Sequence, residues 1–222
     1  MTSIFRLDSS IRQDGSVTRA VADTLQASLL RSLGDGGVVH RDVGLAPLPA
    51  TAWAASAFAG FVPEDQRSDE QKQAKLLAAE LADELLAAEA YIFAVPLYNF
   101  GVSQHVKAWL DILITDPRFA PGAPRLLAGR PAYLVEARGG GYGVGTPRHG
   151  WDHATGWMMR ILSDVLGLQV ELIEAELTLA DVKPELASLR DLAAENLKNA
   201  HGAASLHGEK LASLLIGRVA AE

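Results

Sequence analysis

Residues 90–114, AYIFAVPLYNFGVSQHVKAWLDILI, decide the fold of this chain because they join an apolar strand directly to an amphipathic helix. The first six residues are nearly all apolar, as expected for a strand that helices cover on both faces of a parallel sheet. Residues 102–114 then follow with helical spacing, and Trp109 is expected in the core. Between them stands PLYNFG, whose two aromatic residues are more than a structural turn requires. This corner predicts a strand that ends at a binding site.

The same alternation of strand and helix continues on both sides of this stretch. Strands are predicted at residues 4–7, 38–43, 90–95, 131–137 and 169–173, and helices at 17–33, 66–88, 102–114, 151–166 and from 184 onward. Ser68 is expected to cap the second helix, with Gln71 in its first turn. Strands and helices in this order form a parallel sheet with right-handed crossovers and helices on both faces. The sequence therefore predicts an α/β fold, a doubly wound five-stranded parallel sheet in a single domain over residues 1–222.

Two segments, 46–63 and 115–130, interrupt the alternation. Both contain proline and glycine, and both are long for simple connections. The first also carries Trp53, Phe58 and Phe61, so it is too apolar for a free linker. We expect it to cover part of the molecule or to meet a second subunit.

Composition excludes several classes of function. The net charge is −7 and basic residues do not cluster, which disfavours nucleic acid as a partner. The chain has no cysteine, so disulfides, thiolate metal sites and cysteine nucleophiles are excluded. The N-terminus lacks the apolar stretch of a signal peptide, and no apolar run reaches the length of a membrane span. The expectation is a soluble cytoplasmic protein without a membrane partner.

Three segments that follow strands carry candidate chemistry, and all should lie at one edge of the sheet. The first is DSSIRQDGSVT, residues 8–18, in which the hydroxyls of Ser10, Ser16 and Thr18 can converge with the free N–H groups of a helix start. Such dipoles suit a phosphate monoester without requiring a cation, although Arg12 and Arg19 are available to assist. The alternative is an ordinary helix cap beside a polar loop.

The second segment is PLYNFG, residues 96–101, and the third is EARGGGYG, residues 136–143. Loop backbone groups can read the edge of a heteroaromatic ring while apolar side chains cover its face, although a plugged strand-to-helix corner is the alternative for the second segment. In the third, consecutive glycines let the backbone approach a ligand closely. Arg138 is a candidate to stabilise negative charge on a reduced ring or to steer an anionic substrate. The alternative is a flexible surface loop.

Other chemistries find less support. Neither a GxxxxGK[ST] loop nor a GxGxxG fingerprint occurs, which disfavours P-loop nucleotides and Rossmann dinucleotide binding. No GxSxG nucleophile elbow is present. His149 and His153 in HGWDH have only Asp152 as a further nearby ligand, so no metal site is predicted. No catalytic acid or base is singled out by spacing.

Taken together, the three segments resemble those of the FMN-dependent NADH azoreductases, which are flavodoxin-like quinone reductases of bacteria. Residues 96–100, PLYNF, resemble the family segment PMYNF, and residues 107–111, KAWLD, match its K-x-[WYF]-x-D pattern. Residues 137–140, ARGG, resemble SRGG, and the serines of residues 9–18 resemble the family's phosphate loop. The similarity runs over roughly the whole chain in the same order, and it implies a flavodoxin-like fold.

The resemblance implies roles for residues of all three segments. The FMN phosphate would be held by Ser10, Ser16, Val17 and Thr18; the isoalloxazine would be lined by Leu97, Tyr98, Asn99 and Phe100; and its pyrimidine side would meet Ala137, Arg138, Gly139 and Gly140. The chain departs from the family pattern at three positions. Leu97 replaces methionine with little loss, Thr18 replaces serine and keeps a hydroxyl, and Ala137 replaces serine and removes a hydroxyl to which the resemblance assigns one hydrogen bond with the flavin.

The function implied by the resemblance is transfer of two electrons from NADH or NADPH, through bound FMN, to a quinone or azo compound in a ping-pong scheme. The resemblance also implies a homodimer with the flavin near the interface. Two other functions remain open from the residues: an electron carrier like flavodoxin, whose compact TxTGxT loop is absent here, and a flavin-free module that binds a small phosphorylated ligand.

Overall fold

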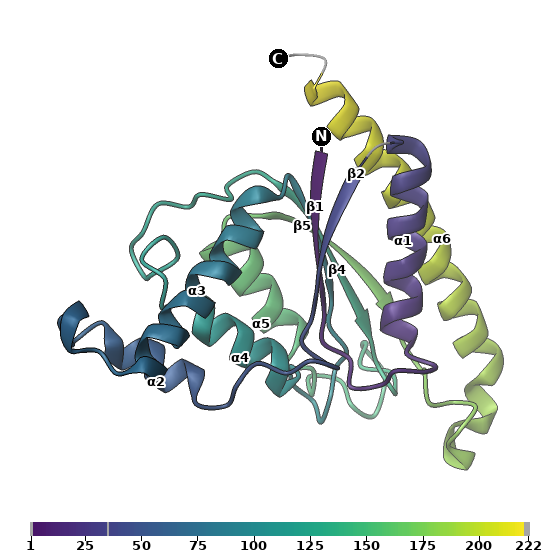
Figure 1. Ribbon diagram of the computed structural model, residues 1–222. Helices are drawn as coiled ribbons and strands as arrows, with labels where there is room; N and C mark the ends of the chain where they lie inside the picture. The colour runs from purple at the N-terminus through teal and green to yellow at the C-terminus, as the bar shows by residue number, and fades with distance from the viewer. Residues whose placement is uncertain (1, 35, 220–222) are drawn as a thin grey trace.

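The computed structural model describes residues 2–34 and 36–219, and its centre is a five-stranded sheet in the order β2-β1-β3-β4-β5 (Figure 1). The strands are β1 (Thr2–Asp8), β2 (Gly36–Asp42), β3 (Ala90–Ala94), β4 (Pro131–Ala137) and β5 (Gln169–Ala175). All neighbouring strands pair in parallel. Every residue of β3 is buried, which matches its central place and its unbroken apolar sequence. The predicted doubly wound parallel α/β fold is confirmed.

Helices cover both faces of this sheet. Helices α1 (Val17–Leu33) and α6 (Arg190–Val219) lie together on one face, whereas α3 (Asp69–Ala87), α4 (Gln104–Leu113) and α5 (Thr155–Met159) lie on the other (Figure 1). Alternate residues of the strands divide between two cores: Ile4 and Ile92 pack with α1 and α6, and Phe5 and Phe93 pack with α3 and α4. Trp109 is only 1% exposed and stacks on Phe5, so its predicted place in the core is confirmed.

Several element boundaries differ from those expected. Helix α3 begins at Asp69, after a short 3-10 turn at Glu64–Gln66, because Ser68 and Gln71 form a reciprocal capping box. The helix expected from residue 151 begins at Thr155, since the Asp152 carboxylate accepts the N–H groups of Ala154 and Thr155 and holds the preceding residues in a turn. It then widens into a π-helical turn at Arg160–Val165. The last segment starts as a 3-10 turn at Pro184–Leu189 before α6.

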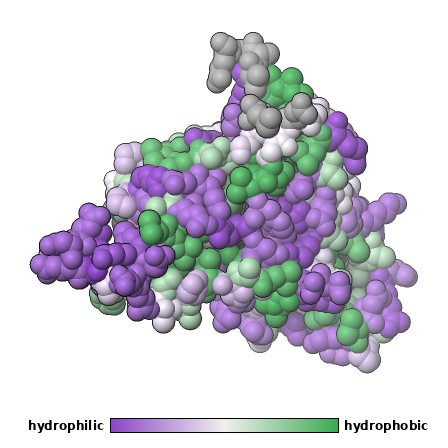
Figure 2. Space-filling view, in the orientation of Figure 1, coloured by the Kyte–Doolittle hydropathy of each residue, from purple (hydrophilic) through white to green (hydrophobic). Residues whose placement is uncertain are grey.

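The segment at residues 46–63 contains a helix that the sequence pattern did not predict, α2 (Ala52–Ala59). This helix packs against α3, so the segment covers part of the molecule, as expected. Trp53, Phe58 and Phe61 nevertheless remain 52%, 64% and 86% exposed. Elsewhere on the surface, the face in Figure 2 shows several separate hydrophobic patches among hydrophilic residues. Within the described ranges, no helix has both the length and the apolarity that crossing a bilayer demands.

Candidate functional site

The candidate site lies at the carboxyl edge of the sheet, where β1 has β2 on one side and β3 on the other. Because the crossovers leave β1 and β3 in opposite directions at this point, the loops that follow them open a crevice. Two backbone hydrogen bonds join the loops at their origins: Ser9 N–H donates to the Ala94 carbonyl (3.0 Å), and Leu97 N–H donates to the Ala137 carbonyl (3.0 Å). The three segments selected from the sequence therefore start side by side.

A pocket at this edge contains residues of all three segments. Its lining consists of Ser10, Arg12, Ser16, Val17, Thr18, Pro96, Leu97, Tyr98, Ala137, Gly139, Thr178 and Leu179. A neighbouring depression shares Tyr98 and adds Asn99. Phe100, Arg138 and Gly140 line neither hollow. The structure thus brings together most of the predicted binding residues, and places those three beside the pocket instead of in its wall.

The first segment presents a cluster of hydroxyl groups at the start of α1. Ser10 Oγ lies 2.9 Å from Ser16 Oγ and 3.1 Å from the Tyr98 hydroxyl, and it accepts the N–H of Arg12 at 3.3 Å. Ser16 caps α1 by accepting the N–H of Arg19, which leaves the N–H groups of Val17 and Thr18 without intrahelical partners. Hydroxyls and free amides at the positive end of a 17-residue helix form a site suited to an anion.

The second segment folds into a tight reverse turn. Tyr98 and Gly101 exchange both backbone hydrogen bonds, at 3.0 and 2.9 Å, around Asn99 and Phe100. These two residues have φ angles of 48° and 69°, a left-handed pairing typical of type I′ turns. Asparagine tolerates this region, whereas phenylalanine seldom adopts it. Phe100 is retained by edge contacts with Tyr142 and Trp151 at ring distances of 6.5 and 5.2 Å, so the turn is tied to the third segment.

The third segment is not a free surface loop, because the turn that follows β5 holds it. Thr178 N–H donates to the Arg138 carbonyl at 3.0 Å, and Leu179 N–H donates to the Gly139 carbonyl at 3.3 Å. A Cβ at Gly139 would lie 2.6 Å from the Leu179 side chain, so a larger residue at this position requires Leu179 to move.

The sequence interpretation missed Thr178 and Leu179 as pocket residues. The available signal was their position, since they follow the fifth strand at the same edge of the sheet.

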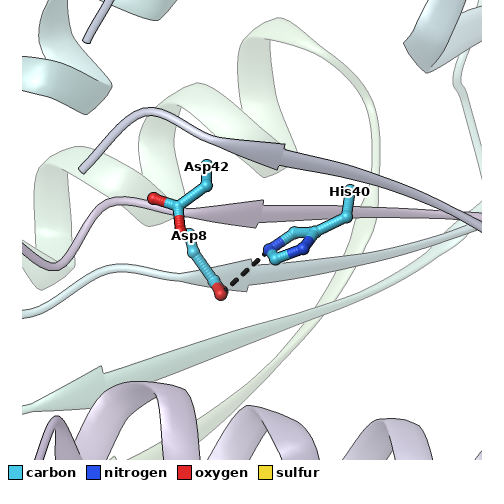
Figure 3. A group of neighbouring side chains, drawn as sticks. All are labelled: Asp8, His40 and Asp42. Atoms are coloured by element: carbon cyan, nitrogen blue, oxygen red, sulfur yellow. Dashed lines mark hydrogen bonds and ion pairs between the residues drawn. The ribbon is translucent and has the colours of Figure 1, made fainter. Parts of the chain in front are cut away.

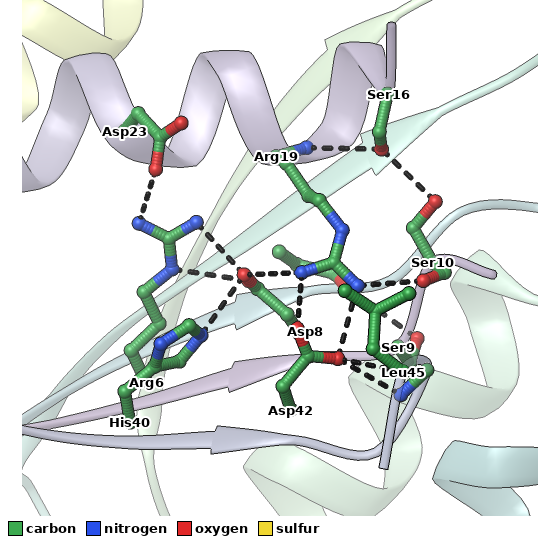
Figure 4. Close-up of polar contacts among 12 residues, drawn as sticks. Arg6, Asp8, Ser9, Ser10, Ser16, Arg19, Asp23, His40, Asp42 and Leu45 are labelled. Carbon is green, nitrogen blue, oxygen red and sulfur yellow. Dashed lines mark hydrogen bonds and ion pairs between the residues drawn. The ribbon is translucent and has the colours of Figure 1, made fainter. Parts of the chain in front are cut away.

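Behind the hydroxyl loop lies a network of ion pairs in which two arginines match two buried or half-buried carboxylates, and Arg6 also pairs with the exposed Asp23 at 2.6 Å. Asp8 Oδ2 receives Arg6 at 2.9 Å, Arg19 at 3.1 Å and His40 at 3.0 Å, while Arg19 also binds Asp42 through both of its terminal nitrogens (Figure 4). Burial alone would raise the pKa of Asp8, but the hydrogen bonds from His40 and Arg6 outweigh burial and lower it.

Asp8, His40 and Asp42 also stand as close together as metal ligands, within 4.8 Å of one another (Figure 3). Arg6 and Arg19 already neutralise the carboxylates of this group, because both guanidinium groups lie in direct contact with them. We therefore assign the group to ion pairing that supports the neighbouring loop, and not to a metal centre.

On the other side of the pocket, one arginine is surrounded by four carboxylates. The Arg138 side chain is 8% exposed and contacts Glu136 at 3.3 Å, Asp152 at 3.1 Å, Glu176 at 3.2 Å, and Glu174. Its guanidinium therefore points away from the pocket, unlike the flavin-facing or substrate-steering place considered from the sequence. Glu136 is completely buried, and burial raises its pKa to about 7 although Thr155 and Arg138 oppose the shift.

Comparison with known proteins identifies the family and agrees with the fold. A family model described as flavodoxin-like fold matches residues 2–198. An FMN-dependent NADH:quinone oxidoreductase of Frankia alni is 37% identical over 194 residues, which cover 86% of this chain and 92% of that protein. A Streptomyces avermitilis protein of the same name is 33% identical, covering 96% of this chain and 98% of that protein.

Solved structures agree on the fold. An azoreductase from Bacillus anthracis superposes with a TM-score of 0.75 at 19% identity, and an FMN-dependent NADH-azoreductase from the same species, solved with FMN, superposes with a TM-score of 0.76 at 17% identity. Each comparison covers 95% of this chain and 100% of the other. The chain therefore belongs to the flavodoxin-like family that includes the FMN-dependent NADH:quinone oxidoreductases.

Proposed function

We propose that this chain is an FMN-dependent oxidoreductase that transfers two electrons from NADH or NADPH to quinones and azo compounds. The observation that carries the proposal is the pocket that joins a hydroxyl-lined helix start, a reverse turn and a glycine loop at one edge of the sheet. The names of the relatives, which specify FMN, NADH and quinone, support the same activity. When bound, FMN supplies the hydride and electron transfer.

The residues of the pocket fit such a cofactor. The hydroxyls of Ser10, Ser16 and Thr18, with the free amides of the first turn of α1, suit its phosphate. Leu97 and Tyr98 offer apolar and aromatic surface to a flat ring, and Asn99 stands at the border of the adjoining depression. Ala137 and Gly139 present backbone to the ring's polar edge. Arg138 acts on this edge indirectly, by holding the glycine loop from behind.

We also infer a ping-pong order. The depression beside Tyr98 adjoins the phosphate-side pocket and shares that residue with it, so NAD(P)H and the acceptor would occupy the depression in turn. An enzyme that oxidises NADH must be in a compartment that supplies NADH, so we propose that this protein acts in the cytoplasm. The exposed Trp53, Phe58 and Phe61 supply an apolar surface for a homodimer. Sedimentation that finds only monomer at micromolar concentration would contradict the dimer.

The test of the proposed activity is the visible spectrum of the purified protein after reconstitution with FMN. We expect a bound flavin spectrum that bleaches on anaerobic addition of NADH and returns on addition of a quinone. Steady NADH consumption with the quinone separates this enzyme from an electron carrier. A protein that stays colourless with excess FMN would overturn the proposal and leave the flavin-free binding module.

Asn99 provides a sharper test of the ring site. Asn99→Asp keeps the size of the side chain and its tolerance of left-handed backbone, but it places a negative charge beside the ring. We expect weaker FMN binding or a more negative flavin potential, measured by flavin retention on dilution and by anaerobic redox titration. Unchanged retention, potential and turnover would remove Asn99 from the ring site.

A further inference from the structure

Arg19 lies directly behind the hydroxyl loop and makes contacts with three parts of the chain. Its Nη2 donates to the carbonyl oxygen of Ser10 at 2.6 Å, and its Nε donates to the carbonyl oxygen of Arg12 at 3.1 Å. Its terminal nitrogens also bind Asp42 at 2.5 and 2.9 Å (Figure 4). One side chain of helix α1 thus joins the loop after β1 to the end of β2.

All three nitrogens of this guanidinium are engaged with protein groups, and Arg19 does not line the pocket. The hydrogen bond to Asp42 raises the pKa of Arg19, so the cation persists at every working pH. Asp42 is itself fixed, because its carboxylate accepts the N–H groups of Gly44 and Leu45. A Cβ at Gly44 would lie 2.1 Å from the Ser10 carbonyl oxygen, which shows how closely the second loop backs the first.

Arg12 contrasts with Arg19 although both belong to the same loop and helix start. Arg12 is exposed and lines the pocket. Among the described residues its guanidinium enters no ion pair. Two arginines considered together from the sequence therefore occupy different positions: one at the pocket, and one behind it.

We propose that Arg19 is a positioning residue, which fixes the carbonyls of Ser10 and Arg12 so that the Ser10 hydroxyl and the Arg12 side chain face the phosphate of the cofactor. The inference rests on the proposed function, because it names FMN as the ligand. Arg19 itself touches no ligand. Removing it lets the loop relax away from the geometry in which Ser10 Oγ meets Ser16 Oγ and the Tyr98 hydroxyl.

The experiment compares Arg19→Lys with Arg12→Ala, titrating each variant with FMN and with riboflavin at low and high salt. Lysine keeps the charge near Asp8 and Asp42 but lacks the planar fork that reaches both carbonyls. Loss of one or two charge-assisted hydrogen bonds predicts that Arg19→Lys weakens FMN binding about 10- to 100-fold. Riboflavin lacks the phosphate, and both arginines act on the phosphate side of the pocket. It should therefore bind both variants within about threefold of wild type.

The salt dependence of FMN binding distinguishes a positioning residue from one that contacts the phosphate directly. The weakening of FMN binding in Arg12→Ala should shrink as salt is raised, because an exposed charge is screened. The weakening in Arg19→Lys should depend less on salt than that in Arg12→Ala, because it includes the misplaced Ser10 hydroxyl as well as the displaced Arg12 charge. An Arg19→Lys variant that binds FMN like wild type, or whose loss shrinks with salt in parallel with Arg12→Ala, would overturn the proposal.

Amide hydrogen exchange of residues 10–12 in the FMN-free protein tests the role of Arg19 in the loop without depending on FMN binding. We expect faster exchange in Arg19→Lys than in wild type while the amides of β3 stay protected, which also verifies that the variant is folded. Asp42→Asn, which leaves Arg19 in place and removes its anchor, should show the same change to a smaller degree. If wild type fails to bind FMN, the proposed function fails; if wild type binds FMN and the loop exchange is unchanged in both variants, only the role of Arg19 fails.

Discussion

Two buried charge networks flank the pocket, and they differ in balance. Behind the hydroxyl loop, Arg6 and Arg19 match the buried or half-buried Asp8 and Asp42 in charge, with His40 as a further donor, and Arg6 also pairs with the exposed Asp23. Behind the glycine loop, Arg138 is the one cation that the described residues place against four carboxylates, Glu136, Asp152, Glu174 and Glu176. Asp8 and Glu136 are equally inaccessible, at 1% and 0% exposed, yet the pKa of Asp8 is lowered and that of Glu136 is raised to about 7.

The difference teaches that burial alone does not set the protonation state of a carboxyl group. Burial opposes ionisation in both networks, and the number of nearby cations decides whether ionisation is restored. The hydrogen bonds of the Thr155 hydroxyl are consistent with a protonated Glu136. Thr155 Oγ1 lies 2.5 Å from Asp152 Oδ2 and also contacts Glu136 Oε2, but a single hydroxyl proton can serve only one of these oxygens. A proton held by Glu136 near neutral pH satisfies the remaining contact.

The largest expected effect is the loss of Arg138, the one cation that the described residues place in the unbalanced network. Arg138→Ala leaves the half-buried Asp152 and Glu176 without a counter-charge and releases the glycine loop. Breaking a buried ion pair from one side costs about 3–5 kcal/mol, so the free energy of unfolding in urea should fall by that order. Arg160→Ala is the matched control, because Arg160 is 74% exposed in its pair with Asp164 and should cost under about 1 kcal/mol. Similar losses in both variants would mean that Arg138 is not structural.

The second effect is a pH dependence with a defined sign. The folded protein holds a proton on Glu136 up to about pH 7, whereas its ordinary pKa is 4.5, so folding takes up a proton between these values. Stability therefore falls as pH rises from about 4.5 to 7 and levels off above.

Glu136→Gln should remove this slope. The free energy of unfolding of this variant should equal that of wild type near pH 4 and exceed it by about 3 kcal/mol at pH 8, measured by urea unfolding across pH. In the balanced network the sign is opposite, because the lowered pKa of Asp8 gives stability that is lost only as pH falls below its ordinary range. A wild-type protein and a Gln variant that keep parallel pH profiles would show that Glu136 ionises normally.

The sheet and the order of the three loops followed from local patterns, because apolar strands, helix caps and glycine runs are written in neighbouring residues. Neither charge network could be predicted in the same way, since Arg19 meets Asp42 and Arg138 meets Glu176 across long stretches of chain. The direction of the Arg138 side chain was nevertheless within reach of the sequence. Residues 136 and 138 stand two apart at the end of a strand, so their side chains share the face opposite to Ala137. Arg138 therefore had to point away from the pocket that Ala137 lines.

Helix α2 was missed for a different reason. Its alanine-rich sequence has high helix propensity, but the helix is short and stands among prolines and glycines, which are typical of loops. The left-handed turn at Asn99 and Phe100 was also beyond prediction, since phenylalanine seldom adopts that region and the two rings that pack against Phe100, those of Tyr142 and Trp151, come from a distant part of the chain.

The smallest expected effects test charge balance most directly, by removing one carboxylate from each network. Asp42→Asn keeps an oxygen for the N–H groups of Gly44 and Leu45 but leaves Arg19 with one counter-charge, so we expect a loss of about 1 kcal/mol in urea unfolding at pH 7. Glu174→Gln removes one of four carboxylates around Arg138, and its side chain is 43% exposed. Because three negative groups remain, stability should stay within about 0.5 kcal/mol of wild type or increase. An equal decrease in the free energy of unfolding of both variants would show that each ion pair contributes independently and that the charge balance of the network has no effect on stability.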